Sequence, residues 1–329
     1  MQPIDVHTHV VPEQFPAYVG AGKDVPWPSM APAHACHAHV VIQGKTYRTV
    51  HQSCWNVDDR LKDMDRQVVG VQCLSPMPEL LSYWLPAKDA QALLRHVNDC
   101  IADMVARQPV RFRGLGGVPL QDVDLAVREL EYIMKTLKFD GVELASHIDG
   151  VTLGDPRFEP FFAAAESLGA AIFVHALRPA GHDRLVGPVT EQVVCFPGDI
   201  GLAVASMITG GISERHPKLR IAFSHGGGVA PILMGRLDRA WDITAKMREA
   251  LPKKPSAYSK RFYYDSIVFT AANLHYILQA FGESQVLVGS DYPFGMGDPD
   301  PVAFLRSCGL AREALEAVLS GNAARFLGI

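Results

Sequence analysis

Eight short apolar segments recur along the 329-residue chain, and each is followed by turn residues and then by a stretch with helical spacing. This alternation is typical of a parallel sheet whose strands are joined by crossover helices. Most of the segments are continuously apolar, as strands covered on both faces should be. We predict strands at residues 4–9, 70–75, 113–118, 141–144, 170–175, 220–225, 262–266 and 286–291. Eight such units predict an α/β fold, a (β/α)8 TIM-like barrel with an outer ring of helices.

One segment interrupts this rhythm directly after the first strand. Residues 11–55 are rich in Pro, Gly, Ala and His, and residues 39–48 have the pattern of a small hairpin around Gly44. We therefore expect one barrel domain over residues 1–329 with an insertion at about 11–55. Between the predicted strands, residues 122–137 and 155–168 have the apolar spacing of amphipathic helices.

The composition is that of an ordinary globular protein, with 48% hydrophobic and 20% charged residues. A net charge of -4 without a block of like charges gives no indication of a nucleic-acid or membrane-surface binder, so we expect a small-molecule substrate. The first residues do not resemble a secretory signal, and the uncharged runs are shorter than the ~20 residues of a membrane helix. Six scattered cysteines form no C-x-x-C pair, which indicates reduced thiols and a cytoplasmic location.

Chemically capable side chains collect at the ends of four of the predicted strands. The first ends in His7 and His9, the fifth in His175, the sixth in His225 and the eighth in Asp291. Active sites of α/β barrels form at the C-terminal ends of the strands, and each of these residues follows an apolar run. The arrangement therefore predicts a site at the barrel mouth.

A divalent metal ion accounts for most of this set. In a strand, residues i and i+2 point to the same face, so His7 and His9 can bind one ion together. His175 and Asp291 would complete a nitrogen and oxygen environment that suits Zn²⁺, tolerates other divalent ions and leaves a position open. We predict one ion per subunit, because the end of the fourth strand, residues 141–147, contains no lysine that could bridge two metal ions.

The histidine of the sixth strand has a different environment. His225 is followed by three glycines that allow a ligand to approach the backbone, and it can exchange a proton near the ion. The same string is similar to the oxyanion-hole motif of esterases. The chain contains no G-x-S-x-G nucleophile elbow, so we reject an esterase.

In their order, these motifs resemble the decarboxylase branch of the amidohydrolase superfamily. The resemblance rests on Ile-Asp-Val-His-Thr-His at 4–9, Val-His at 174–175, Ser-His-Gly-Gly-Gly at 224–228, Gly-Arg-Leu-Asp-Arg-Ala-Trp at 235–241 and Gly-Ser-Asp-Tyr-Pro-Phe at 289–294. The Gly44, Lys45, Arg48, Gln52 and Trp55 spacing of the insertion is similar too. The resemblance extends over nearly the whole chain.

The resemblance implies a role for each matching residue. His7, His9, His175 and Asp291 would bind zinc, with His225 as the acid/base and Asp291 also in the catalytic set. Arg48 and Arg236 would hold substrate carboxylates, and in this family the second arginine comes from the neighbouring subunit of a homodimer. Guanidinium forks suit this task because they donate two parallel hydrogen bonds. The implied reaction is the non-oxidative decarboxylation of an unsaturated or aromatic carboxylate, without an organic cofactor.

Other activities remain open at this point. A hydrolase or hydratase of a ring-cleavage product would use the same metal site without releasing CO₂. A catalytically silent barrel that binds a dicarboxylate would be expected to lack a ligand, and none of the five core positions is missing.

Two features leave the substrate and a second site open. Ala176, Leu177 and Arg178 stand where the resemblance predicts a proline and an aromatic residue, so the exact substrate is not fixed, and Arg178 is either a pocket cation or a surface-paired residue. The spacing of the potential ligands His34, Cys36, His37 and His39 fits no structural zinc signature.

Overall fold

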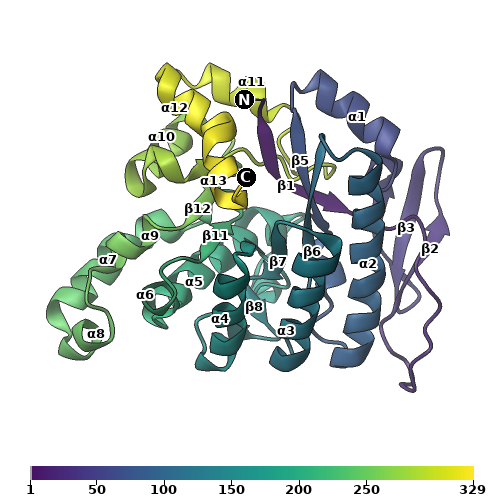
Figure 1. Ribbon diagram of the computed structural model, residues 1–329, viewed down its shortest axis with the longest axis horizontal. Helices are drawn as coiled ribbons and strands as arrows, with labels where there is room; N and C mark the ends of the chain where they lie inside the picture. The colour runs from purple at the N-terminus through teal and green to yellow at the C-terminus, as the bar shows by residue number, and fades with distance from the viewer. Residues whose placement is uncertain (1) are drawn as a thin grey trace.

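The computed structural model describes residues 2–329, in which eight parallel strands curl into a barrel (Figure 1). Each strand pairs with the next along the chain, and the bridges Asp5–Val288 and Thr8–Tyr292 join the first strand to the last segment. The predicted barrel is therefore confirmed. The strands are β1 (Ile4–Val10), β5 (Val71–Pro76), β6 (Phe112–Gly117), β7 (Gly141–Ala145), β10 (Ala171–His175), β11 (Arg220–Phe223), β12 (Tyr263–Asp265) and β13 (Val286–Leu287).

Two strands end two or more residues earlier than the sequence predicts. β11 ends at Phe223 rather than at His225, and β13 ends at Leu287 rather than at Asp291. His225 and Asp291 have φ angles of 55° and 61°, in the left-handed region, where a residue cannot continue a strand. Both residues therefore turn out of the sheet at the barrel mouth.

Helices between the strands form the outer ring. The predicted helix at 122–137 is α3 (Val123–Tyr132) followed by the π-helical turn η3 (Ile133–Leu137), and Asp122 caps it by accepting a hydrogen bond from the Leu125 amide. The predicted helix at 155–168 is α4 (Glu159–Leu168), which follows a short 3₁₀ turn. The other principal helices are α1 (Val57–Arg66), α2 (Ala87–Arg107), α5 (Phe196–Thr209), α7 (Ala230–Ile243), α10 (Ala271–Phe281), α11 (Pro301–Ser307) and α13 (Asn322–Leu327).

The insertion after β1 is a three-stranded antiparallel sheet at one side of the barrel, outside α2 (Figure 1). It consists of β2 (Pro28–Pro32), β3 (His37–Ile42) and β4 (Lys45–His51). Gln43 and Gly44 both have positive φ angles, 52° and 70°, which a two-residue hairpin turn requires. The predicted hairpin around Gly44 is present, and its second strand carries Arg48 to the barrel mouth.

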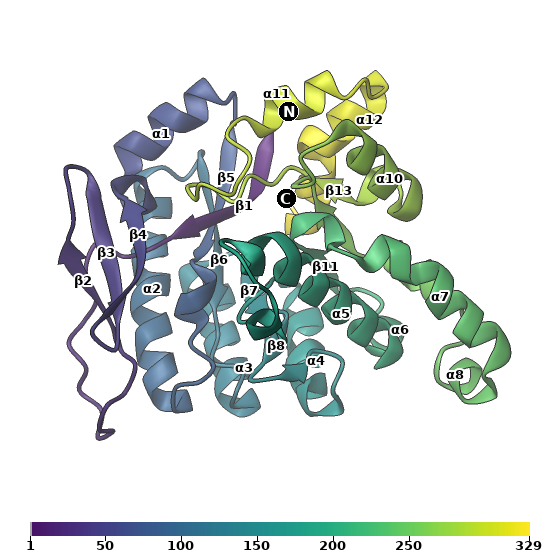
Figure 2. The same ribbon diagram turned by 180° about the vertical axis from the view of Figure 1, so that it is seen from behind.

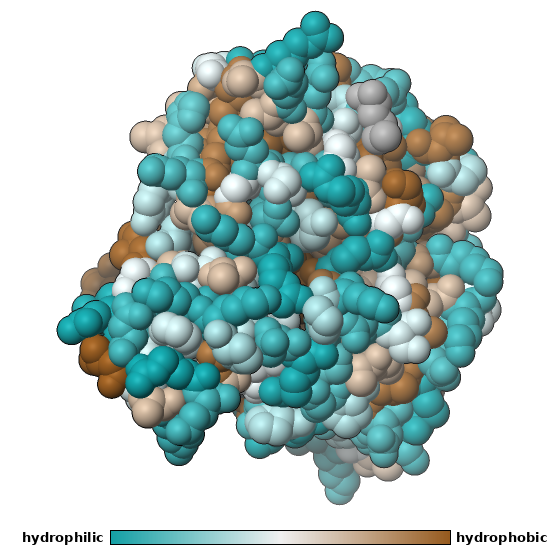
Figure 3. All heavy atoms as spheres, turned by 60° about the vertical axis from the view of Figure 1, so that its left-hand side comes forward, coloured by the Kyte–Doolittle hydropathy of each residue, from teal (hydrophilic) through white to brown (hydrophobic). Residues whose placement is uncertain are grey.

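Helices α7 and α8 (Ala245–Ala250) project from the opposite side of the barrel (Figure 2). Two apolar residues of α7 are largely exposed, Ile232 at 67% and Ile243 at 64%. On the face drawn in Figure 3, hydrophilic residues predominate and hydrophobic residues form small, separate patches.

The helical segment Glu191–Thr209 is long and apolar enough to cross a membrane by length and composition. In the fold, however, α5 buries Ile200, Val204 and Met207 in the hydrophobic core of the barrel. A helix of a globular fold with one buried face can pass the same composition test, so length and composition alone are weak evidence for a membrane span.

Arg60 of α1 is fully buried behind the end of β1. Its guanidinium donates hydrogen bonds to the His9 carbonyl (2.6 Å), the Gln72 side-chain oxygen (3.1 Å) and the Thr8 hydroxyl (3.2 Å). These bonds hold the strand end that carries His7 and His9 in place.

We predict that Arg60→Ala lowers the free energy of unfolding by at least about 2 kcal/mol, because it leaves buried acceptors without a donor. Arg66→Ala removes an exposed arginine of the same helix and should change it by no more than about 0.5 kcal/mol. Chemical denaturation measures both. Equal effects of the two substitutions would contradict the anchoring role of Arg60.

Candidate metal centre and active site

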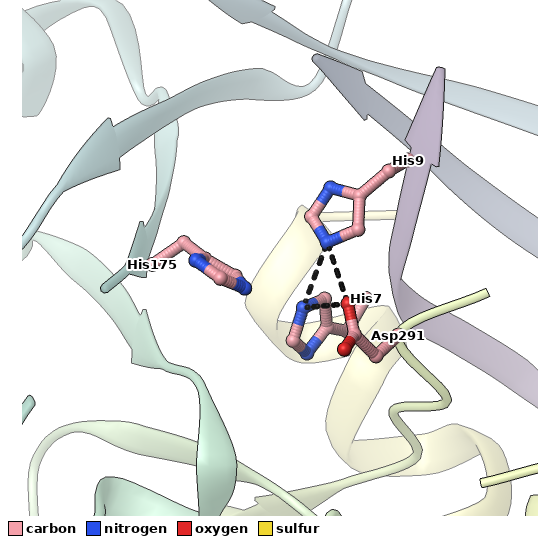
Figure 4. A group of neighbouring side chains, drawn as sticks. All are labelled: His7, His9, His175 and Asp291. Atoms are coloured by element: carbon pink, nitrogen blue, oxygen red, sulfur yellow. Dashed lines mark hydrogen bonds and ion pairs between the residues drawn. The ribbon is translucent and has the colours of Figure 1, made fainter. Parts of the chain in front are cut away.

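The predicted ligands converge at the barrel mouth, as Figure 4 shows. His7 and His9 extend from β1 toward Asp291, and the His175 imidazole points toward them from the end of β10. The His9 Nε2 atom lies 3.0 Å from the Asp291 carboxylate and 3.1 Å from the His7 Nε2 atom. One ligand atom from each of the four residues lies within 4.8 Å of the others. This spacing is compatible with a shared ion.

The hydrogen bonds at Nδ1 of the three imidazoles direct the other ring nitrogen of each, Nε2, toward the cluster. His7 Nδ1 donates to the Asp265 carboxylate (2.7 Å), His9 Nδ1 to the Pro76 carbonyl (3.1 Å) and His175 Nδ1 to the Ala176 carbonyl (2.6 Å). A neutral imidazole that donates from Nδ1 has its lone pair on Nε2. The three Nε2 lone pairs therefore face the cluster, and His175 Nε2 is buried without a hydrogen-bond partner in the structure. The donor set fits a divalent ion.

The pKa values of the imidazoles determine whether a metal ion must displace a proton in order to bind. Burial alone would lower the pKa of His7, but the hydrogen bond and charge of Asp265, with Asp291 and Glu143, raise it to about 9. For His175, burial and the neighbouring histidines hold the pKa well below its usual value. A metal ion needs neutral imidazoles, so it must displace a proton from His7 and finds His175 already neutral.

Asp265 contacts the cluster, although the sequence analysis did not single it out. Besides the His7 ring, its carboxylate accepts hydrogen bonds from the backbone amides of His225 (2.9 Å) and Gly226 (2.8 Å). These donors outweigh burial and lower the pKa of Asp265, so it stays ionised. The available signal was an aspartate at the end of a predicted strand, in the same position as the other site residues.

His225 lies beside the cluster, with its ring centroid 4.9 Å from that of His175 and 5.7 Å from that of His7. It lines the same cavity as His9, His175 and Asp291. Burial lowers the pKa of His225 to about 4, although Asp265 opposes the shift. At neutral pH the imidazole is neutral and able to accept a proton.

A cavity of about 930 Å³ opens in front of the cluster. Arg48 lines it, with the guanidinium carbon 4.5 Å from the centroid of the Phe294 ring. Arg236, in contrast, is exposed on α7 and does not line the cavity of its own chain. The structure brings together five of the predicted site residues and Arg48, and places Arg236 apart from them.

The histidine-rich part of the insertion has a different geometry. The His34 and His37 ring centroids lie 4.4 Å apart, and Cys36 Sγ lies 3.6 Å from His37 Nδ1. Among residues 2–329, however, only His7, His9, His175 and Asp291 bring three or more ligand atoms close enough to share an ion.

Comparisons with known proteins agree with the fold. The family model described as amidohydrolase matches residues 4–329. A relative from Dictyostelium discoideum, named 2-amino-3-carboxymuconate-6-semialdehyde decarboxylase, is 34% identical over 99% of this chain and 91% of its own.

Two solved structures have the same architecture. That of 5-carboxyvanillate decarboxylase from Sphingomonas paucimobilis is 30% identical, with a TM-score of 0.75 and 82% of each chain covered. That of dihydroxybenzoic acid decarboxylase from Polaromonas sp. JS666, solved with bound manganese, is 24% identical, with a TM-score of 0.74 over 82% of this chain and 85% of that one. The chain therefore belongs to the amidohydrolase family, among relatives that are named as decarboxylases.

Proposed function

We propose that this protein is a zinc-dependent non-oxidative decarboxylase of an unsaturated or aromatic carboxylate, most like 2-amino-3-carboxymuconate-6-semialdehyde. The observation that carries the proposal is the convergence of three Nε2 atoms and the Asp291 carboxylate, with each Nδ1 atom occupied by an acceptor. The curated relative that is similar over almost the whole chain supports the substrate class.

In this proposal His7, His9, His175 and Asp291 hold one divalent ion. When bound, the ion supplies Lewis-acid polarisation of a substrate oxygen. Three nitrogens and one carboxylate oxygen are a ligand set that Zn²⁺ accepts. Glu143, on the fourth strand of the barrel, has its carboxylate oxygen Oε2 3.9 Å from His9 Nδ1. Nδ1 is the ring nitrogen of His9 that faces away from the cluster. This placement favours a single ion.

His225 is the acid/base in this proposal. Its neutral imidazole takes up a proton from bulk solvent and gives it to the substrate carbon that carries the carboxylate, so the reaction consumes one solvent proton for each CO₂ released. The bond between that carbon and the carboxylate then breaks, its electron pair restores the conjugated system, and CO₂ leaves. Asp265 is a positioning residue, because it holds both the His7 ring and the backbone at His225.

Arg48 and Arg236 complete the proposed site as carboxylate ligands. Arg48 faces the cavity of its own chain, whereas Arg236 lies on the projecting helix α7 one turn beyond the exposed Ile232. A second copy that packs against α7 would bury this apolar side chain and receive Arg236. We therefore propose a homodimer with a shared active site.

We also propose that residues 1–329 form a single domain and that the protein is cytoplasmic. The strand order follows the sequence, which supports one domain interrupted only by the insertion. All six cysteines are free, as expected of a reducing compartment.

The function is tested by CO₂ release from carboxymuconate semialdehydes and hydroxybenzoates. We expect His225→Ala to retain the metal and to lower turnover by about 10²- to 10⁴-fold, because it removes an acid/base and no ligand. His175→Ala should instead lose the metal. Conversion of the same compounds without CO₂ release would favour a hydratase or hydrolase. A metal-free His225 variant would contradict the assigned role of His225.

A second prediction concerns Asp265. Asp265→Asn should weaken metal binding by about 10- to 100-fold, because the carboxylate orients the ring and raises the basicity of His7. Asp140→Asn is the control. Asp140 is also a buried carboxylate, but it directly precedes β7, at the end of the barrel away from the cluster, and it pairs with Arg113. Competition with a metal chelator gives both affinities. An unchanged affinity in Asp265→Asn would exclude the positioning role.

A third prediction tests the shared site. Arg48→Ala and Arg236→Ala should each impair catalysis, but a mixture of the two, dissociated and reassembled, should recover about a quarter of wild-type activity, because heterodimers contain one intact site. Arg239→Ala, a change at an exposed arginine of the same helix, should remain active. Failure to complement despite proven subunit exchange, or a fully active monomer, would place both arginines outside a shared site.

A further inference from the structure

Glu79 and Arg178 form an ion pair in the wall of the cavity that contains the metal ligands. Glu79 lies in the short 3₁₀ helix η2 (Pro78–Leu81), which follows β5, and Arg178 is three residues beyond His175 at the end of β10. The two residues therefore reach the cavity from different strands of the barrel, beside the proposed reaction site.

In this ion pair the carboxylate of Glu79 balances the positive charge of Arg178. Its Nε and Nη2 atoms both donate to the Glu79 Oε1 atom, the first at 3.2 Å. The guanidinium carbon also lies 3.2 Å from the centroid of the Trp84 ring, which holds the group in place from another side. Arg178 is 45% exposed at the mouth of the cavity, whereas its partner Glu79 is only 4% exposed. The positive charge that Arg178 brings to this wall is therefore balanced by a buried carboxylate.

Glu79 in turn retains capacity to accept a hydrogen bond. Burial raises the pKa of its carboxyl group, and the Arg178 guanidinium and Tyr47 hydroxyl oppose the shift. A carboxylate has about four lone-pair sites, and the two donors of Arg178 both bind Oε1, so that Oε2 accepts no hydrogen bond from Arg178. An acceptor therefore remains on a residue that lines the cavity.

Arg48 lines the same cavity but differs from Arg178 in its pairing. Its guanidinium packs on the Phe294 ring and, within residues 2–329, forms no ion pair. One wall of the pocket is therefore suited to an anionic group. Near Glu79, a second anionic group of the substrate would face a carboxylate whose charge Arg178 already balances. Binding of an anion at this wall is therefore unfavourable.

We propose that Glu79, held by Arg178, is a specificity-determining residue that accepts a hydrogen bond from a neutral hydroxyl or amino group of the substrate and excludes a carboxylate from that position. The inference rests on the proposed function and narrows it. The substrate class becomes unsaturated or aromatic carboxylates that carry a neutral hydrogen-bond donor.

Binding of matched benzoates to the zinc-loaded protein tests the inference without turnover. The probes are benzoate and its 2- and 3-substituted hydroxyl, amino and carboxylate derivatives, measured by calorimetry. At one ring position or both, wild-type protein should bind the hydroxyl or amino derivative more tightly than benzoate, and the dicarboxylate less tightly. The two donor series show whether an oxygen or a nitrogen donor is preferred.

Glu79→Gln should reverse this preference, because it releases Arg178 to pair with the added carboxylate. The affinity for the dicarboxylate relative to the hydroxybenzoate should rise by about tenfold or more. The double variant Glu79→Gln with Arg178→Gln should lose this gain, which separates the released charge of Arg178 from a general loosening of the pocket.

Glu129→Gln is the matched control. Glu129 is 3% exposed and accepts from Arg95, whose guanidinium stacks on Tyr132, but this pair lies between α2 and α3, away from the cavity. Its substitution should leave the affinity ratio within about twofold of wild type, as changes that do not touch a site usually do. Three results would overturn the inference: an unchanged ratio in Glu79→Gln, an equal shift in Glu129→Gln, or no binding of any probe. Absence of CO₂ release with intact binding preferences would instead contradict only the proposed decarboxylation.

Discussion

The pairing between β1 and the segment after β13 is the constraint on which the site depends. Val6 donates its amide to the Val288 carbonyl (3.0 Å), Asp291 to the His7 carbonyl (2.9 Å) and His9 to the Tyr292 carbonyl (2.7 Å). These bonds join the two ends of the strand order and place the Asp291 side chain beside those of His7 and His9. The contact that closes the barrel therefore also assembles three of the four proposed ligands.

A single carboxylate then links the ligand cluster to the proposed acid/base. The Asp265 carboxylate accepts hydrogen bonds from His7 Nδ1 and from the backbone amides of His225 and Gly226. Because the left-handed turn at His225 follows a strand that ends at Phe223, these two amides have no partner in the sheet, and Asp265 supplies one for each. Asp265 thus orients the ring of His7, a proposed metal ligand, and holds the backbone of His225, the proposed acid/base.

Much of this arrangement could be predicted from the sequence. The apolar strands gave the barrel, and the histidines and aspartate at strand ends gave the cluster, because the C-terminal ends of parallel strands meet at one place. The left-handed turns at His225 and Asp291 were not predicted, since neither residue is a glycine.

The pair formed by Glu79 and Arg178 was not predicted either. Its partners lie 99 positions apart, and only the closed barrel brings them together. The contact between Asp265 and His7 was not predicted for the same reason, because His7 belongs to the first strand of the barrel and Asp265 to the seventh. Pairings between distant segments depend on the register and curvature of the sheet, which the spacing of apolar residues does not specify.

The most direct test of the account is a zinc titration of metal-free protein in which bound ion and CO₂ release are followed together. If the four ligands form one catalytic site, both signals should rise linearly and reach a plateau at one ion per chain. A plateau of CO₂ release only at two ions per chain, or full release from the metal-free protein, would contradict the central claim.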